Sequence, residues 1–278
     1  NFTNTILSTY GTEFYRKATH GEGFIRGFFN VIKSATTGTG AALERLFITG
    51  VSPVTMDDVT SGFNIGTNIT NDSWFNDLVG FSENELREML KYYKGQGVLQ
   101  ESIDEIVAMM KPNYDNYCFS EDTLEQCMFN SDMALYFLKS FVLHHKKPKE
   151  IVDPNIRTDF NKLAYLIKLD HGLGENFSVI KEIAEQGEIV TDIVTHFSAL
   201  EMTDPSNFKS LLFYFGLLSI KGVDMVGRPI LHVPNLVVRE QLFNFLIQGY
   251  IKHDIFKIDM NKMSALFELS LIHISEPT

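Results

Sequence analysis

The sequence predicts a mixed α/β fold that is predominantly helical, and three observations lead to this prediction. Apolar residues recur at helical spacing along much of the 278-residue chain. Residues 8–51 give a helix, a Gly/Thr-rich loop and a short apolar segment, which is the order of half an α/β repeat. Residues 207–251 give helix, strand, turn, strand and helix, which is the skeleton of a winged-helix module.

The first expected elements are a helix over residues 8–34 and a buried strand over Leu46–Val51, separated by the breaker Thr36–Ala42. Thr49 and Ser52 lie at the tip of this strand, where open α/β sheets bind ligands. Two interpretations stay open for them. They could hydrogen-bond a γ-phosphate or its attacking water, or they could be ordinary turn residues at a strand end.

The next part of the chain predicts a loop followed by several helices. Residues 54–77 are polar and rich in Gly and Asn, which favours a loop with at most one short strand. Ser82 and Glu85 have the spacing of a capping box, so a helix should occupy residues 81–94. Further helices are expected at 99–110 (ended by Pro112), 131–144, 158–169 and 178–187.

The segment Tyr-Asp-Asn-Tyr at residues 114–117 interrupts this helical region. It is typical of a tight turn packed on a core, because Asp and Asn hydrogen-bond neighbouring backbone groups. Alternatively, Tyr114, Asp115 and Tyr117 could line a pocket. Asn116 can take a left-handed conformation, since asparagine is the side-chain-bearing residue that best accepts it.

The last structured part predicts a hairpin between two helices. A helix over 207–215 should lead into strands at 217–223 and 229–233, with Gly227 available for a positive φ in the turn. Asn235 is a good N-cap for a helix over 237–251. The residues proposed for DNA contact are Lys221, Arg228 and Arg239. An ion pair with Glu240 is the alternative for Arg239.

Composition and missing motifs exclude several functions. The net charge of −11 argues against a broad nucleic-acid surface, and two cysteines are too few for a disulfide framework. No apolar run is long enough to span a bilayer, so the expected location is cytoplasmic without a membrane partner. Gly-Lys never occurs, which excludes a P-loop, and no lysine follows an acidic residue by two positions, as a [DE]-x-K nuclease requires. No catalytic residue and no metal ligand is assigned.

Six segments in collinear order give a more specific indication. They are "LFITGVSPV", "GFSENELREML", "YDNYCF", "FNSDMALYFL", "LLFYFGLLSI" and "VPNLVVREQLF". Over residues 1–269 the chain resembles the bacterial predicted AAA-ATPase-like family. In that family a P-loop ATPase region precedes a helical region and a winged-helix-like module, and a PD-(D/E)XK nuclease domain often follows.

The resemblance implies a fold and a domain division. The fold would be the remnant of a parallel P-loop ATPase sheet, followed by a helical region and a winged-helix-like module. The implied boundaries are 1–115 for the C-terminal part of the ATPase domain, 116–200 for the helical region, 201–255 for the winged-helix-like module and 256–278 for a truncated tail. Residues 271–278 resemble a translated sequencing adapter, which suggests a metagenomic gene fragment.

The resemblance also implies a function. The parent protein would bind and hydrolyse ATP with Mg²⁺, coupled to a nuclease, and Thr49 and Ser52 would sense the nucleotide. This chain lacks the P-loop, Walker B and nuclease motifs, so we expect it to be catalytically silent and to bind no cofactor tightly. Its partners would be the missing N-terminal P-loop part and C-terminal domain of the parent. Uncovered apolar residues at 46–48 predict self-association. The alternative is a non-enzymatic binding module or scaffold that contacts DNA or protein.

Overall fold

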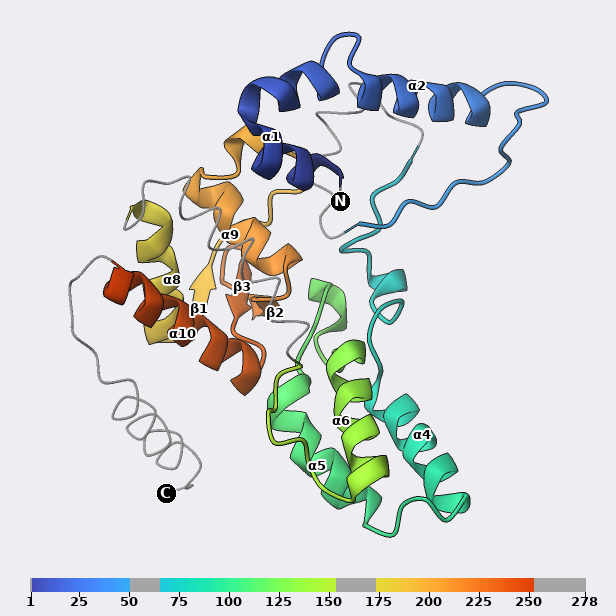
Figure 1. The fold of residues 1–278 in the computed structure, drawn as a ribbon, viewed down its shortest axis with the longest axis vertical. Coiled ribbons are helices and arrows are strands. Elements are labelled where there is room, and N and C mark those ends of the chain that lie inside the picture. The colour runs from blue at the N-terminus through green and yellow to red at the C-terminus, as the bar shows by residue number, and fades with distance from the viewer. Residues whose placement is uncertain (1, 51–65, 154–173, 253–278) are drawn as a thin grey trace.

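The computed structural model describes residues 2–50, 66–153 and 174–252, and this part of the chain is predominantly helical (Figure 1). Eight α-helices and one three-stranded antiparallel sheet occur within these ranges. Helices α1 and α2 lie at one end of the molecule, α4 to α6 form a second group, and the sheet lies between α8, α9 and α10. No helix in the described ranges is long and apolar enough to cross a membrane. The expected helix at 158–169 and the tail lie outside the described residues.

The N-terminal region forms two helices where one was expected. Helix α1 (Phe2–Thr19) and helix α2 (Phe24–Thr36) are separated by a short turn, and α1 is itself kinked at Gly11, whose φ is 78°. Ile25 of α2 is buried against Ala18 of α1. Phe24, Phe28 and Val31 of α2 are all more than half exposed, so much of the apolar surface of this helix faces solvent.

The expected strand at Leu46–Val51 is wrong over residues 46–50, which are irregular. Leu46, Phe47 and Ile48 are all exposed. A strand of a parallel sheet needs a neighbouring strand to pair with its backbone and helices to cover both its faces. No strand in the described part of the chain pairs with these residues, because the three described strands pair only with one another.

Helices α4 (Glu83–Gly95), α5 (Ile103–Tyr114) and α6 (Ser131–His144) enclose one hydrophobic core. The helices predicted around residues 81–94 and 131–144 are confirmed. The capping box is also confirmed: the Ser82 hydroxyl accepts a hydrogen bond from the Glu85 amide, and the Glu85 carboxylate accepts one from the Ser82 amide. The largest fully buried side chains of this core are Leu86, Leu90, Ile106, Met110, Tyr114 and Phe129.

Pro112 does not end its helix, contrary to the sequence prediction. Helix α5 continues through Pro112 to Tyr114. Proline removes one backbone donor and disfavours a helical residue before it. Here Met110 and Tyr114, on either side of the proline, are both buried in the core, and the Asp115 amide still donates to the Lys111 carbonyl. Burial of this helix face therefore outweighs the local preference.

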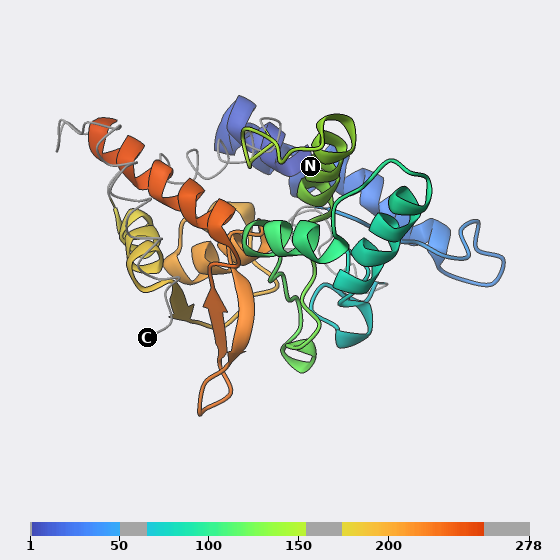
Figure 2. The same ribbon diagram turned by 90° about the horizontal axis from the view of Figure 1, so that it is seen from below.

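The second core lies around the antiparallel sheet. The sheet consists of strand β1 (Glu188–Val190) and a hairpin of β2 (Ser219–Val223) and β3 (Pro229–His232). Its helices are α8 (Glu175–Gln186) before β1, the 3₁₀ helix η4 (Ala199–Glu201) and α9 (Pro205–Tyr214) between β1 and the hairpin, and α10 (Leu236–Lys252) after the hairpin. The strand order is β1-β3-β2, so the last strand lies in the middle. Figure 2 shows the hairpin turn projecting from this unit.

The hairpin and its flanking helices were predicted, and strand β1 was not. Gly227 has a φ of 85° in the hairpin turn, and Asn235 caps α10 by accepting a hydrogen bond from the Val238 amide. Strand β1 has only three residues, and its partners in β3 lie forty or more positions further along the chain. Such a short strand with a distant partner gives no periodic signal in the sequence.

Candidate functional site

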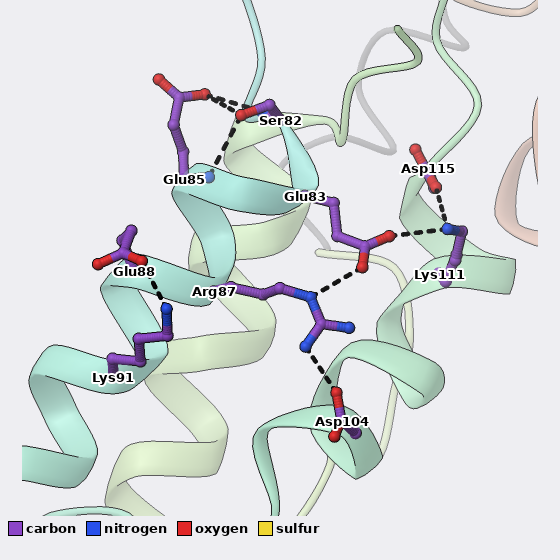
Figure 3. Close-up of polar contacts among 9 residues, drawn as sticks. All are labelled: Ser82, Glu83, Glu85, Arg87, Glu88, Lys91, Asp104, Lys111 and Asp115. Atoms are coloured by element: carbon purple, nitrogen blue, oxygen red, sulfur yellow. Dashed lines mark hydrogen bonds and ion pairs between the residues drawn. The ribbon is translucent and has the colours of Figure 1, made fainter. Parts of the chain in front are cut away.

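A network of charged side chains joins the N-terminus of α4 to both ends of α5 (Figure 3). The Glu83 carboxylate accepts hydrogen bonds from Lys111 Nζ and from Arg87 Nε, each at 2.8 Å. Arg87 also donates from Nη1 to Asp104 at 2.6 Å. The hydrogen bond from Lys111, followed by that from Arg87, lowers the pKa of Glu83. Glu83 therefore stays ionised and links the two helices.

Asp115 is the buried member of this network. It follows α5 directly and is only 4% exposed. Its Oδ2 lies 3.9 Å from Lys111 Nζ, whereas its Oδ1 has no hydrogen-bond partner among the described residues. Burial raises the pKa of Asp115, and the hydrogen bond from the Asn116 amide and the charge of Lys111 only partly oppose this effect. A carboxylate here is costly because one oxygen has lost its hydration.

The turn at residues 114–117 connects the two hydrophobic cores. Asn116 has a φ of 73°, as expected for an asparagine at a left-handed position. Its side-chain amide donates to the Pro234 carbonyl at 3.0 Å, and the Asn235 side chain donates back to the Asp115 carbonyl at 3.1 Å. These two bonds tie the end of α5 to the start of α10, although more than a hundred residues separate them.

The two tyrosines of this turn are held by the surrounding structure. The Tyr114 hydroxyl donates to the Ile151 carbonyl, and Tyr117 exchanges backbone hydrogen bonds with Met128. Burial raises the pKa of both phenols. The segment is therefore a turn packed between two cores. Whether its side chains also serve a ligand stays a prediction.

Two further observations concern metal-ligating and nucleophilic side chains in the described part of the chain. No group of three or more His, Cys, Asp or Glu side chains in the described ranges could hold a metal ion. Burial raises the pKa of the Cys118 thiol, and it raises that of the Cys127 thiol to about 11. Thiols with raised pKa values stay protonated near neutral pH and are poor nucleophiles.

The three basic residues proposed for DNA contact are engaged within the chain. Lys221 of β2 pairs with Glu188 of β1. Arg228, in the hairpin turn, pairs with Asp224 at 2.8 Å. The Arg239 guanidinium lies 6.0 Å from the centre of the Phe243 ring. Contacts within the chain compete with phosphate for these cations, although exposed ion pairs of this kind are weak.

Of the two residues proposed to sense a nucleotide, Thr49 is exposed in the irregular segment that follows α2. Ser52 lies outside the described residues. A nucleotide-sensing role for them stays a prediction.

Comparison with known proteins supports one relationship. Residues 1–60 match the model of a family described as predicted AAA-ATPase. The match covers α1, α2 and the irregular segment that carries Thr49. Neither a curated protein nor a solved structure matches the chain. The family model thus supports an AAA-ATPase-like relationship for the N-terminal region.

The network of Glu83, Arg87 and Lys111 was not predicted from the sequence. A signal was present, because Glu83 and Arg87 are four positions apart on one helix, and Asp115, just after α5, is four positions from Lys111. The contact between Glu83 and Lys111 joins two helices, and spacing along the chain gives no indication of it.

Proposed function

We propose that this chain is part of an AAA-ATPase-like P-loop protein that binds and hydrolyses ATP with Mg²⁺. The match of residues 1–60 to the predicted AAA-ATPase family carries this proposal. The sequence contains no Gly-Lys, the dipeptide through which a P-loop lysine reaches the phosphates. We therefore propose that another segment of the parent protein supplies the P-loop and Walker B residues, and that this chain alone does not hydrolyse ATP.

Within that parent, Thr49 and Ser52 would sense the γ-phosphate, and the remaining units would transmit the nucleotide state to a nuclease domain. The hydrogen bonds between the end of α5 and the start of α10 support this second part of the proposal. Such a junction can pass a displacement from one core to the other, because packed cores move as units rather than deform continuously.

The test begins with sequencing the source DNA across both ends of the reading frame. If a Gly-Lys-Ser/Thr motif lies upstream, the extended protein and this chain are compared for Mg²⁺-dependent ATP hydrolysis. The extended protein should turn over ATP and this chain should not.

Thr49→Ala in the extended protein should lower kcat by roughly tenfold or more, because one hydrogen bond to a developing charge is lost. Thr37→Ala changes an exposed threonine at the C-cap of α2, distant in sequence from Thr49, and serves as the matched control. An upstream region without the motif would refute the proposal.

A second candidate function is binding through the unit of α8, the sheet and α9. Its succession of helix, strand, helix, helix and two strands, with the order β1-β3-β2, favours a winged-helix-like module. We propose a protein rather than DNA as its partner. Helix α9 is largely buried, and the cations of the hairpin are paired with carboxylates. A salt-dependent shift of labelled duplex DNA that is lost in Lys221→Gln would overturn this choice.

A further inference from the structure

An exposed apolar surface surrounds the 3₁₀ helix η1 (Ser73–Phe75). It consists of Trp74, Phe75, Leu78 and Val79, which we call the Trp74 surface. Trp74 is 88% exposed and is the only tryptophan in the sequence. Leu78 and Val79 are more than half exposed. Tryptophan is among the residues most enriched at the energetic centres of protein interfaces.

The surrounding structure holds the Trp74 surface in place. Asp72 caps η1 by accepting a hydrogen bond from the Trp74 amide at 2.9 Å. Asn76 is only 2% exposed, and its side chain accepts from the Phe119 amide and donates to the Gln126 carbonyl. These bonds join η1 to the segment around η2 (Glu121–Thr123). A surface fixed in advance loses little conformational entropy when it binds a partner.

A polar cavity of about 410 Å³ adjoins this surface. The residues that line it all have polar side chains, and they include Asn71, Asp72, Asp122 and His196. Neither aspartate forms an ion pair within the described part of the chain. The Oδ1 atom of Asn71 is buried without a donor among the described residues. The exposed carboxylates of Asp72 and Asp122 can therefore accept hydrogen bonds from a cationic group of a partner.

The chain around the cavity is acidic. Residues 66–86 and 112–138 contain no lysine or arginine, and Asp77, Glu121 and Glu125 add exposed carboxylates near the cavity. Complementary charge steers partners toward a surface and suppresses partners of like charge. This field disfavours nucleic acid, and it also disfavours a second copy of a chain whose net charge is −11.

We propose that the Trp74 surface and the adjoining cavity bind a basic amphipathic segment of a partner protein. An arginine of that segment enters the cavity and donates to the carboxylates of Asp72 and Asp122. Guanidinium fits this set because it carries five donors in a fixed plane. Neighbouring apolar side chains of the partner cover Trp74 and Leu78. This inference stands independently of ATP hydrolysis.

Because Trp74 is the sole tryptophan, its fluorescence reports on the site directly. The probe is a 14-residue peptide, about four helical turns, with leucine on one face, arginine on the other and no tryptophan. A peptide with glutamate in place of arginine is its control. The arginine peptide should shift Trp74 emission to shorter wavelength in a saturable way, and added salt should weaken binding. The glutamate peptide should produce no shift.

Two matched pairs of variants distinguish binding at the Trp74 surface from attraction of the peptide to the net negative charge of the chain. Asp122→Asn should raise the Kd of the arginine peptide about tenfold, the loss expected for one charged hydrogen bond. Glu182→Gln removes the same charge from an exposed position on α8 and should change Kd less than about twofold. Leu78→Ser should weaken binding, whereas Leu143→Ser on α6 should not. Circular dichroism verifies that each variant is folded.

Three results would overturn the proposal. One is the absence of an emission shift at saturating arginine peptide. Another is equal weakening by Asp122→Asn and Glu182→Gln, which would indicate attraction to net charge alone. The third is a shift that depends on the concentration of the chain without peptide, which would assign the surface to self-association.

Discussion

The N-terminal region and the α4–α6 unit differ in how far the apolar faces of their helices are buried. Helix α2 has a strong division into apolar and polar faces, yet Phe24, Phe28 and Val31 face solvent. The apolar faces of α4, α5 and α6 are buried together in one core, and their N-terminal turns are stabilised by caps and charges. The region that matches the ATPase family is thus the one whose apolar surface is least covered.

The helical periodicity of a sequence and the packing of the resulting helix are therefore separate properties. An amphipathic sequence determines which face of a helix is apolar, whereas burial of that face requires another surface to pack against it. The α4–α6 unit contains its own partners. We propose that the surface that would cover α2 and residues 46–48 belongs to another part of the parent protein.

The largest expected effect comes from truncating the core of the better packed unit. Phe129 is fully buried and exchanges backbone hydrogen bonds with Phe81. Phe129→Ala should lower the free energy of unfolding by about 3–5 kcal/mol through lost burial and a cavity. Phe28→Ala in α2 should lower it by about 0.5 kcal/mol or less, because the side chain is already exposed.

Urea unfolding followed by circular dichroism measures both effects. Trp74 is unsuitable as an unfolding probe, since it is exposed in the folded chain. If Phe129→Ala and Phe28→Ala lowered the free energy of unfolding equally, the difference in burial between the α4–α6 unit and α2 would be contradicted.

A smaller effect is expected at the helix caps. Ser82 accepts a hydrogen bond from the Glu85 amide, whereas Ser102, at the same position of α5, makes no side-chain capping bond. Ser82→Ala should therefore cost about 1 kcal/mol, and Ser102→Ala should cost much less. The same urea titration measures the difference, and a larger loss in Ser102→Ala would show that the capping box is not formed in solution.

The smallest expected effect is a dependence on pH at Asp115. Burial raises the pKa of Asp115 in the folded chain, so the folded state holds the proton more tightly than the unfolded state. The stability from this group is complete below the ordinary aspartate pKa and is lost as pH rises through the raised value. The Asp115→Asn variant cannot ionise at this position, so it does not lose this stability as the pH rises. The stability of this variant relative to the natural chain should therefore increase as the pH rises above about 4, the ordinary aspartate pKa.

The control for this titration is Asp192→Asn, which changes an exposed carboxylate in the same way. Thermal unfolding across the pH range measures both variants. A stability difference for Asp115→Asn that does not vary with pH would show that Asp115 ionises normally.

The sequence predicted those elements whose signals are local. The capping box at Ser82, the left-handed Asn116, the hairpin turn at Gly227 and the cap at Asn235 all follow from the chemistry of a few adjacent residues. The predictions at Leu46–Val51 and Pro112 were wrong over the described residues for a shared reason. Strand pairing and core packing are properties of distant partners, and they override local preference.

The sites were less predictable than the fold. Charged residues such as Lys221 and Arg228 could be named from the sequence, but their pairing with Glu188 and Asp224 depends on sheet register and turn geometry. The Trp74 surface gave no periodic signal, because it rests on a 3₁₀ turn held by the single buried side chain of Asn76.

The most direct test is amide hydrogen exchange along the full chain. The account predicts that amides of α2 and residues 37–50 exchange far faster than those around Ile106 and Phe129, because the N-terminal region opens without exposing a large core. In an upstream-extended protein the same N-terminal amides should become protected. Equal protection of α2 and the α4–α6 unit in the chain alone would contradict the claim that the ATPase-like region lacks its covering surface.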